Sequence, residues 1–500
     1  MKKYIIKTLG AIALCFSLTG CGDSFLDTKI YDAVDLDKGL AGPTSIGYAL
    51  NGAYYQLYRY NFAGNYATLI GDIGSDLSYH YNSTNHFTDI YRFGYQATDT
   101  YLYYIWNYGY KVIDNAARII EACENLIPTV SGDDEIYLKV YEAEARCLRA
   151  YASLRLVNVF CHQVMVDGKD FSNYPGLVVV DKPIVAFENV KRSSVGATYG
   201  QITNDLEKAI SLFESVGTDQ GDPNYFTLAA AYGLLARANM YLENWDEAIE
   251  AAASAIAESG ITELVYTDSE YAALYRNSFS NDESLFYLYL DAQTSYGSSG
   301  PGTMFSAYGY CPSPKLMNLY GEKDCRRSIL YFTNNSTNEI DPDSWWSAQG
   351  TFSGGKFYYG GGNVQLATNY LINAPEMFLI QAEGYANNGD LSSAQEALLV
   401  VAKRNNAITS TADLPQDKEG LLSFIMDERA RELFQEGHRL WDLRRWNLTV
   451  GVEATNAPDV MYLYNDYQIA DMVFPIPDDE VNAGFGVEQN QGWASLRPTN

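Results

Sequence analysis

Apolar residues recur every three to four positions through most of the chain, the spacing of one buried helix face. In the segment Asp99–Leu126 these positions include Ile105, Val112, Ile113 and Ala116. Similar spacing predicts helices over residues 45–58, 99–126, 135–161 and 197–213, and one long final helix over 418–446. The pattern therefore predicts a mainly α-helical protein.

Two longer segments each predict a pair of helices. Phe226–Glu258 has a polar interruption at residues 243–245, and Ala374–Arg404 has a turn signal at Gly389 and Asp390. Small side chains fall where the two helices of a pair must approach closely, as in a tetratricopeptide repeat. These small residues are Ala238, Ala248, Ala252, Ala255, Ala382, Ala386, Ala394 and Ala402. We expect a helical scaffold over about residues 45–260 and 374–450.

Two stretches lack helical periodicity, residues 61–96 and 264–373. Both are rich in aromatic and polar residues, and the second includes a strand-like run, Ser284–Leu290. A structureless loop of that length is improbable in a compact domain, so we expect an irregular subdomain with short strands. Loops held by a rigid scaffold are the usual place for binding residues.

The chain begins with a targeting pattern. Lys2, Lys3 and Lys7 precede an apolar run, which ends at a lipobox-like sequence with Cys21 directly after Gly20. This pattern predicts a signal peptide over residues 1–20 and acyl chains on the thiol of Cys21, which would anchor a single domain over 21–500 to a membrane. The alternative is an ordinary cleaved secretory signal.

Net charge limits the classes of ligand that the protein can bind, and cysteine content limits its possible disulfides. The net charge is −28, and cleavage before Cys21 removes three lysines and no acid, leaving −31. So acidic a chain argues against binding nucleic acid or anionic lipid heads; it fits a neutral or cationic ligand, or solvation alone. Cys311 and Cys325 are the one pair that we consider for a disulfide. Asp341 and Asp343 fit either a turn or a calcium contact.

Tyrosine is unusually frequent, with 42 of 500 residues. Its ring can stack on the C–H face of a sugar while its hydroxyl forms hydrogen bonds, so the irregular stretches are candidate binding regions. We expect Asp72 and Asp76 to accept hydrogen bonds from sugar hydroxyls and the adjacent Trp345 and Trp346 to provide an exposed platform. The other aromatic candidates are Tyr79, Tyr81, Tyr91, Tyr95, Tyr296 and Tyr358. Burial in a loop core is the competing interpretation for each of them.

Six segments, in order along the chain, resemble the motifs of one family. The most extensive, Glu428–Trp446, follows the pattern ER..EL..EG.R..DLRRW. The segment Phe474–Trp493 begins with the pattern FPIP..E and ends with Asn490 and the pair Gly492-Trp493. The others are residues 25–27, 106–116, 142–151 and 192–206. The chain resembles the SusD/RagB outer-membrane lipoproteins.

This resemblance implies a tetratricopeptide-like scaffold with an irregular ligand-binding part. It further implies a cell-surface protein without catalysis or cofactor, which captures a glycan and passes it to a TonB-dependent SusC-like porin. Two alternatives remain open: a helical glycoside hydrolase, which needs two facing carboxylates, and an assembly subunit that binds no sugar. We interpret Glu428–Trp446 as a core-docking helix with internal salt bridges, such as a pair between Asp427 and Arg431 on one helix face, rather than as a catalytic cluster.

Overall fold

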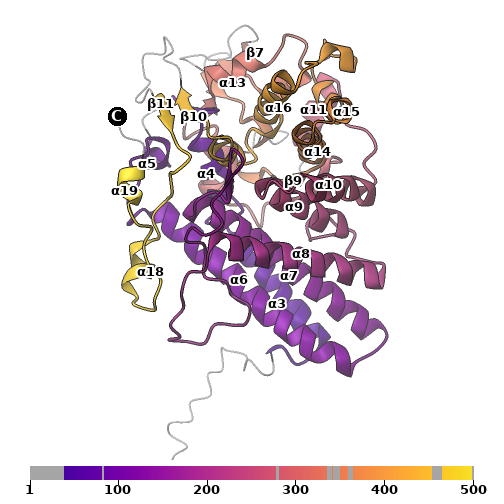
Figure 1. The fold of residues 1–500 in the computed structure, drawn as a ribbon, viewed down its shortest axis with the longest axis vertical. Coiled ribbons are helices and arrows are strands. Elements are labelled where there is room, and N and C mark those ends of the chain that lie inside the picture. Colours follow the sequence, from indigo (N-terminus) through magenta and orange to yellow (C-terminus); the bar gives the residue numbers. More distant parts are fainter. Residues whose placement is uncertain are drawn as a thin grey trace, which may run out of the picture.

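The computed structural model describes residues 39–81, 84–276, 281–334, 340–341, 350–357, 364–452 and 464–497. The predicted mainly helical architecture is confirmed. Four long helices pack side by side in the lower part of Figure 1, in the order α3, α6, α7 and α8. Their bounds are α3 Pro43–Tyr58, α6 Thr100–Leu126, α7 Asp133–Phe160 and α8 Val195–Val216.

The two predicted helix pairs continue the stack upward in Figure 1. They are α9 (Leu228–Tyr241) with α10 (Trp245–Ser259), and α14 (Ala374–Asn388) with α15 (Leu391–Ala402). All eight predicted small contact residues are fully buried. Gly389 ends α14 with a φ of 85°, a conformation that glycine adopts without strain. The predicted turns and close contacts are therefore confirmed.

The predicted final helix over 418–446 is wrong as a single element. It is divided into α16 (Lys418–Leu433) and α17 (Arg439–Arg445). In the break, Gln435 and Gly437 have φ values of 70° and 78°, and the backbone N–H of Gly437 donates to Asp72 Oδ2 over 2.7 Å. The helix ends here because the chain turns to contact α4, a contact that local periodicity does not encode.

The irregular part consists of short elements packed on the scaffold. The predicted strand is β4 (Ser284–Leu288), antiparallel to β9 (Asn369–Asn373). Residues 61–96 were expected to lack helix but contain α4 (Tyr66–Ile73) and the short α5 (Thr88–Tyr91). Further short elements are β1 Ser78–His80, β5 Tyr310–Pro312, α11 Asp268–Arg276, α13 Pro314–Leu319, β7 Ile340–Asp341, β10 Thr449–Val452, β11 Tyr464–Gln468, α18 Asp478–Asn482 and α19 Trp493–Leu496.

The segment Glu428–Trp446 lies in the core with internal salt bridges, as interpreted from the sequence. Arg429 Nε lies 2.9 Å from Asp442 Oδ2, and Arg445 pairs with Glu383 from α14 at 2.6 Å. The expected partner of Arg431 is wrong: its guanidinium reaches Glu428 at 2.5 Å, one helical turn away on the buried side. These pairs tie α14, α16 and α17 together.

Cys311 and Cys325 are free thiols in the core, so the disulfide that we considered is not formed. Burial raises the pKa of the Cys325 thiol to about 12. Within the described ranges, no helix has both the length and the apolarity needed to cross a bilayer. The same ranges hold no cluster of three or more metal-ligating side chains. Cys21 and Asp343 lie outside these ranges.

Candidate functional site

Asp76, expected to meet a ligand, is part of a buried ion pair. Its side chain is inaccessible to solvent. Arg439 approaches both carboxylate oxygens, at 2.8 and 3.0 Å, and Lys315 Nζ lies 2.6 Å from Oδ2. Burial alone would raise the pKa of Asp76, but the two cations outweigh it and lower this pKa. The structure therefore corrects the prediction: Asp76 neutralises Arg439 in the core.

Asp72 is also buried, so the prediction that it accepts hydrogen bonds from sugar hydroxyls is also corrected. It lies in α4, and the N–H of Gly437 is its one hydrogen-bond donor among the described residues. Burial raises the pKa of Asp72 to about 8, although the Gly437 N–H opposes this shift. Asp72 and Asp76 are four residues apart but carry opposite pKa shifts, because only Asp76 contacts cations. A ligand cannot reach either carboxylate without opening the core.

Three predicted tyrosines are likewise core residues: Tyr79, Tyr91 and Tyr95, each at most 1% exposed. Tyr95, for example, packs against Phe474 with ring centroids 4.5 Å apart. Tyr81 is half-buried, and its hydroxyl donates to the Ser306 carbonyl over 3.1 Å. For the first three, burial in a loop core was the correct interpretation, so they are not ligand contacts in this conformation.

The remaining predicted residues divide into two groups. Trp345, Trp346 and Tyr358 lie outside the described residues, so their role stays a prediction. Tyr296 lines a cavity of about 500 Å³. We call this the tyrosine cavity; its lining residues are Asn51, Tyr54, Tyr55, Tyr58, Arg59, Tyr60, Asn224, Tyr225, Leu290, Gln293, Thr294, Ser295 and Tyr296.

Three segments distant in sequence form the tyrosine cavity: the last turns of α3 with the residues after it, the loop before α9, and the loop after β4. Hydrogen bonds to core residues fix the inner wall of the cavity. The N–H of Phe226 donates to Tyr54 Oη over 2.8 Å, and Tyr54 in turn donates to Glu144 over 2.6 Å. The Tyr296 hydroxyl donates to the Tyr58 carbonyl. These bonds hold the aromatic walls in place without a ligand.

The outer wall of the tyrosine cavity is more accessible. Tyr55 is 59% exposed, and its hydroxyl accepts a hydrogen bond from Arg59 Nη1 over 2.8 Å. Tyr60 contacts Tyr66 and Tyr296 edge to face, with ring centroids 5.5 and 6.2 Å apart. The cavity thus combines fixed rings, exposed ring surface and amide and hydroxyl groups, which suits a ligand with both C–H faces and hydroxyls.

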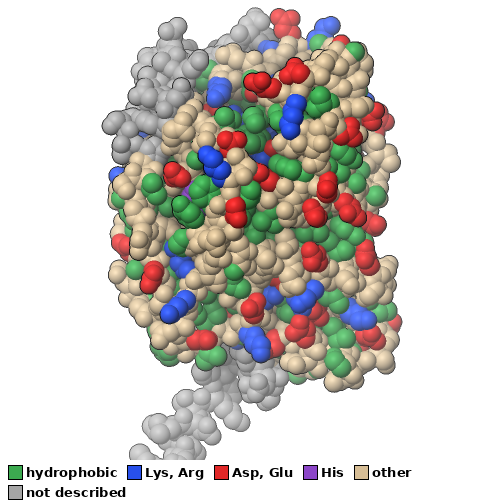
Figure 2. Space-filling view, in the orientation of Figure 1, with side chains coloured by type: hydrophobic (Ala, Val, Ile, Leu, Met, Phe, Trp, Pro, Cys, Tyr) green, Lys and Arg blue, Asp and Glu red, His purple; other side chains and the backbone are tan. Residues whose placement is uncertain are grey.

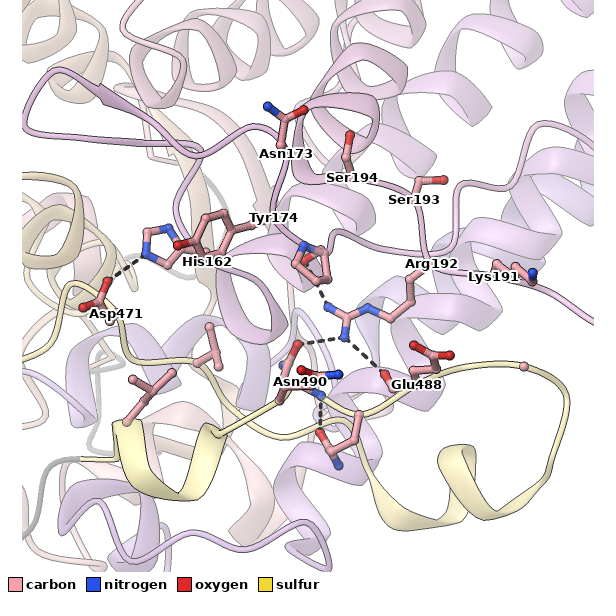
Figure 3. Close-up of a pocket in the computed structure, with 16 residues that line it drawn as sticks. His162, Asn173, Tyr174, Lys191, Arg192, Ser193, Ser194, Asp471, Glu488 and Asn490 are labelled. Carbon is pink, nitrogen blue, oxygen red and sulfur yellow. Dashed lines mark hydrogen bonds and ion pairs between the residues drawn. The ribbon is translucent and has the colours of Figure 1, made fainter.

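A larger cavity, of about 820 Å³, lies between the C-terminal segment and the loop before α8 (Figure 3). Its central cation, Arg192, is already satisfied: the guanidinium donates to the carbonyls of Gly176, Pro175 and Glu488 and to Asn490 Oδ1. In the same cavity His162 Nε2 lies 3.2 Å from Asp471. The polar groups of this cavity mainly join two segments of the chain, so the tyrosine cavity is the better candidate.

Sequence reasoning missed most of the tyrosine cavity. The signal was present in the segment Tyr54–Tyr60, where four of seven residues are tyrosine and one is arginine. Residues 45–58 were interpreted as scaffold, which is correct for the buried Tyr54 and Leu57 but not for the exposed Tyr55. The density of tyrosine at the end of a helix would have identified the region.

Two family models match the chain. The SusD family model matches residues 371–493, and a model described as starch-binding associating with outer membrane matches residues 24–242. No curated protein is similar enough in sequence to count as a match.

Several solved structures have this fold. A putative sugar binding protein from Bacteroides vulgatus is 24% identical with a TM-score of 0.77, covering 90% of this chain and 98% of that chain. A SusD superfamily protein from Bacteroides thetaiotaomicron is 22% identical with a TM-score of 0.75, covering 90% and 99%. The solved structures show a shared fold across nine-tenths of the sequence, and the two family models, which match residues 24–242 and 371–493, identify the chain as a SusD/RagB family protein.

Proposed function

We propose that this protein is a cell-surface lipoprotein that binds an oligosaccharide in the tyrosine cavity and delivers it to a TonB-dependent SusC-like porin of the outer membrane. The observation that carries the proposal is the cavity itself. Six tyrosines surround a space of about 500 Å³, which has room for a few sugar rings. Stacking on aromatic rings together with hydroxyl hydrogen bonds is the chemistry by which proteins bind neutral sugar faces.

Binding without hydrolysis is the form of this function that we favour. Glycoside hydrolysis ordinarily requires two carboxyl groups on opposite sides of the scissile bond. The described lining of the tyrosine cavity includes neither Asp nor Glu, and Asp72 and Asp76 are enclosed in the core. We therefore expect the pure protein to release no reducing ends from polysaccharides.

The location and the porin partner rest on other support. The lipobox at Cys21 supports an acyl anchor, and the family description of outer-membrane association supports the compartment. Mass spectrometry of the native protein should find an acylated Cys21 at the mature amino terminus. Co-purification with a porin from membranes of the native bacterium would support delivery; an unacylated protein found in the cytosol would contradict the proposal.

Calorimetry after a glycan-array screen tests the binding site. Tyr55→Ala should weaken affinity for an array hit about 10-fold, because it removes an exposed stacking ring worth roughly 1–1.5 kcal/mol. Tyr174→Ala, in the larger cavity, and Tyr137→Ala, on α7, are matched controls, since these side chains are 48% and 52% exposed. Loss of affinity in Tyr174→Ala alone would move the site to the larger cavity. A protein that binds no glycan would refute the function.

A further inference from the structure

Arg59 lies at the edge of the tyrosine cavity with most of its hydrogen-bonding capacity unused. Its Nη1 donates to the Tyr55 hydroxyl, and the guanidinium also interacts with Tyr108; both partners are neutral. The Nε of Arg59 is shielded from solvent and has no hydrogen-bond partner among the described residues. No described carboxylate lies within ion-pair distance of it. Arg439 and Arg326, two buried arginines elsewhere in the chain, are each paired with carboxylates.

A second cation, Lys111, lies near the same aromatic ring as Arg59. The Arg59 guanidinium carbon is 5.7 Å from the ring centroid of Tyr108, and Lys111 Nζ is 4.5 Å from the same centroid. Both residues come from packed helices or their ends, Arg59 directly after α3 and Lys111 from α6. An anion bound at Arg59 would be attracted by both positive charges.

Neighbouring carboxylates do not compensate these cations. Asp222 accepts hydrogen bonds from the backbone and side-chain nitrogens of Asn224. Asp291 accepts from Gln293 and Thr294. Both carboxylates keep their negative charge, but each forms these hydrogen bonds within its own turn, and neither forms an ion pair with Arg59 or Lys111 among the described residues.

We infer that the glycan bound in the tyrosine cavity is acidic, with a carboxylate or a sulfate ester placed against Arg59 and a sugar ring against the tyrosines. The planar guanidinium offers paired N–H donors that match the oxygens of such a group, and these charge-assisted bonds are stronger than bonds to hydroxyls. This inference rests on the proposed glycan-binding function and names its substrate class.

The net charge of −28 is no obstacle to an anionic ligand. At physiological ionic strength, interactions between exposed charges are largely screened beyond about 8 Å. A direct contact with Arg59 therefore outweighs distant carboxylates once the ligand is bound. On the face shown in Figure 2, acidic and basic side chains are interspersed rather than separated into one negative field. The acidic surface slows approach of the ligand more than it weakens the complex.

Paired probes test the inference. An array should carry oligogalacturonate, sialyl-lactose and a sulfated oligosaccharide, each beside its methyl-esterified, desialylated or desulfated counterpart. We expect binding to the charged member of at least one pair, with affinity that falls as salt concentration rises. Comparing the three pairs identifies whether the anion is a carboxylate or a sulfate.

Variants then assign the contact. Arg59→Gln should weaken binding of the charged probe about 10- to 100-fold, as expected for lost hydrogen bonds to a charged group, and should change binding of the neutral counterpart less than 2-fold. Lys139→Gln changes the net charge equally but lies on α7 in a pair with Glu135, so it should leave affinity unchanged. Thermal melts confirm that each variant is folded.

The outcomes separate the two proposals. Binding of neutral probes alone, lost in Tyr55→Ala, would overturn the acidic-ligand inference and leave the glycan-binding function intact. Binding of a charged probe that Arg59→Gln does not weaken would overturn the inference as well. Binding of neither class would overturn both.

Discussion

Replacing Asp76 by Asn should destabilise the protein rather than remove a ligand contact. Asp76 is fully buried and neutralises Arg439 through two hydrogen bonds of 2.8 and 3.0 Å. Asn removes the negative charge and keeps the volume, so the Arg439 guanidinium remains in the core without its counter-charge.

The structure sets the expected magnitude. Removing one partner of a buried pair costs about 3–5 kcal/mol, and Asn at this position retains one acceptor, so we expect about 3 kcal/mol. That is a large share of the roughly 5–15 kcal/mol that stabilises a typical domain. The side chain of Lys315 is 43% exposed, and a pair so open to solvent contributes about 0–1 kcal/mol. Lys315→Gln is therefore the matched control.

Urea unfolding and calorimetry measure the two effects separately. Asp76→Asn should lower the unfolding midpoint clearly and Lys315→Gln only slightly, while the folded fraction of each binds glycan as the wild type does. Because the folded-state pKa of Asp76 is lowered, its stabilisation is present above its unfolded pKa of about 3.9 and is lost as pH falls through the folded value. An unchanged midpoint combined with lost glycan affinity would refute this reasoning and restore Asp76 as a ligand residue.

Three further changes test other parts of the structure. The folded-state pKa of Asp72, about 8, lies above its unfolded value, so the wild type loses stability as pH rises from 5 to 8. Asp72→Asn should reduce this loss of stability in urea titrations. An unchanged pH dependence would contradict the assignment. Gly437→Ala should cost at least about 2 kcal/mol in the same assay, since the added carbon meets the Thr68 carbonyl at a φ of 78°, whereas Gly389→Ala, in open space, should cost about 1 kcal/mol. Trp345→Ala with Trp346→Ala should lower glycan affinity in calorimetry without changing the thermal melt; unchanged affinity would count against that platform.

Local sequence predicted the helix pairs because their determinants are local. The turn at Gly389 and Asp390, the periodic apolar residues and the alternating alanines each act within a few residues of one another. The break after Leu433 was missed because the apolar pattern continues through Phe434, Leu440 and Trp441. Its cause is the contact of Gly437 with Asp72, 365 residues apart in the chain.

The candidate site was harder to predict because residue type does not specify burial. Tyr79 and Tyr55 are the same side chain, yet one is inaccessible and the other is 59% exposed. The difference arises from pairing between β1 and β5, which covers Tyr79, and from the position of Tyr55 at the open edge of α3. Among the predicted residues that the structure describes, Tyr296 alone lies at the tyrosine cavity.

The arginines show why a high density of charge in the sequence does not mark a binding site. The segment Glu428–Trp446 concentrates charge because it joins several helices: Arg429 pairs with Asp442 and Arg445 with Glu383. A guanidinium whose charge is already neutralised offers a ligand little. Arg59 stands outside the charge-rich segment and has no carboxylate partner among the described residues, so its charge is open to an incoming anion. The inference of an acidic ligand therefore rests on hydrogen-bonding capacity left unused after folding, rather than on charge density in the sequence.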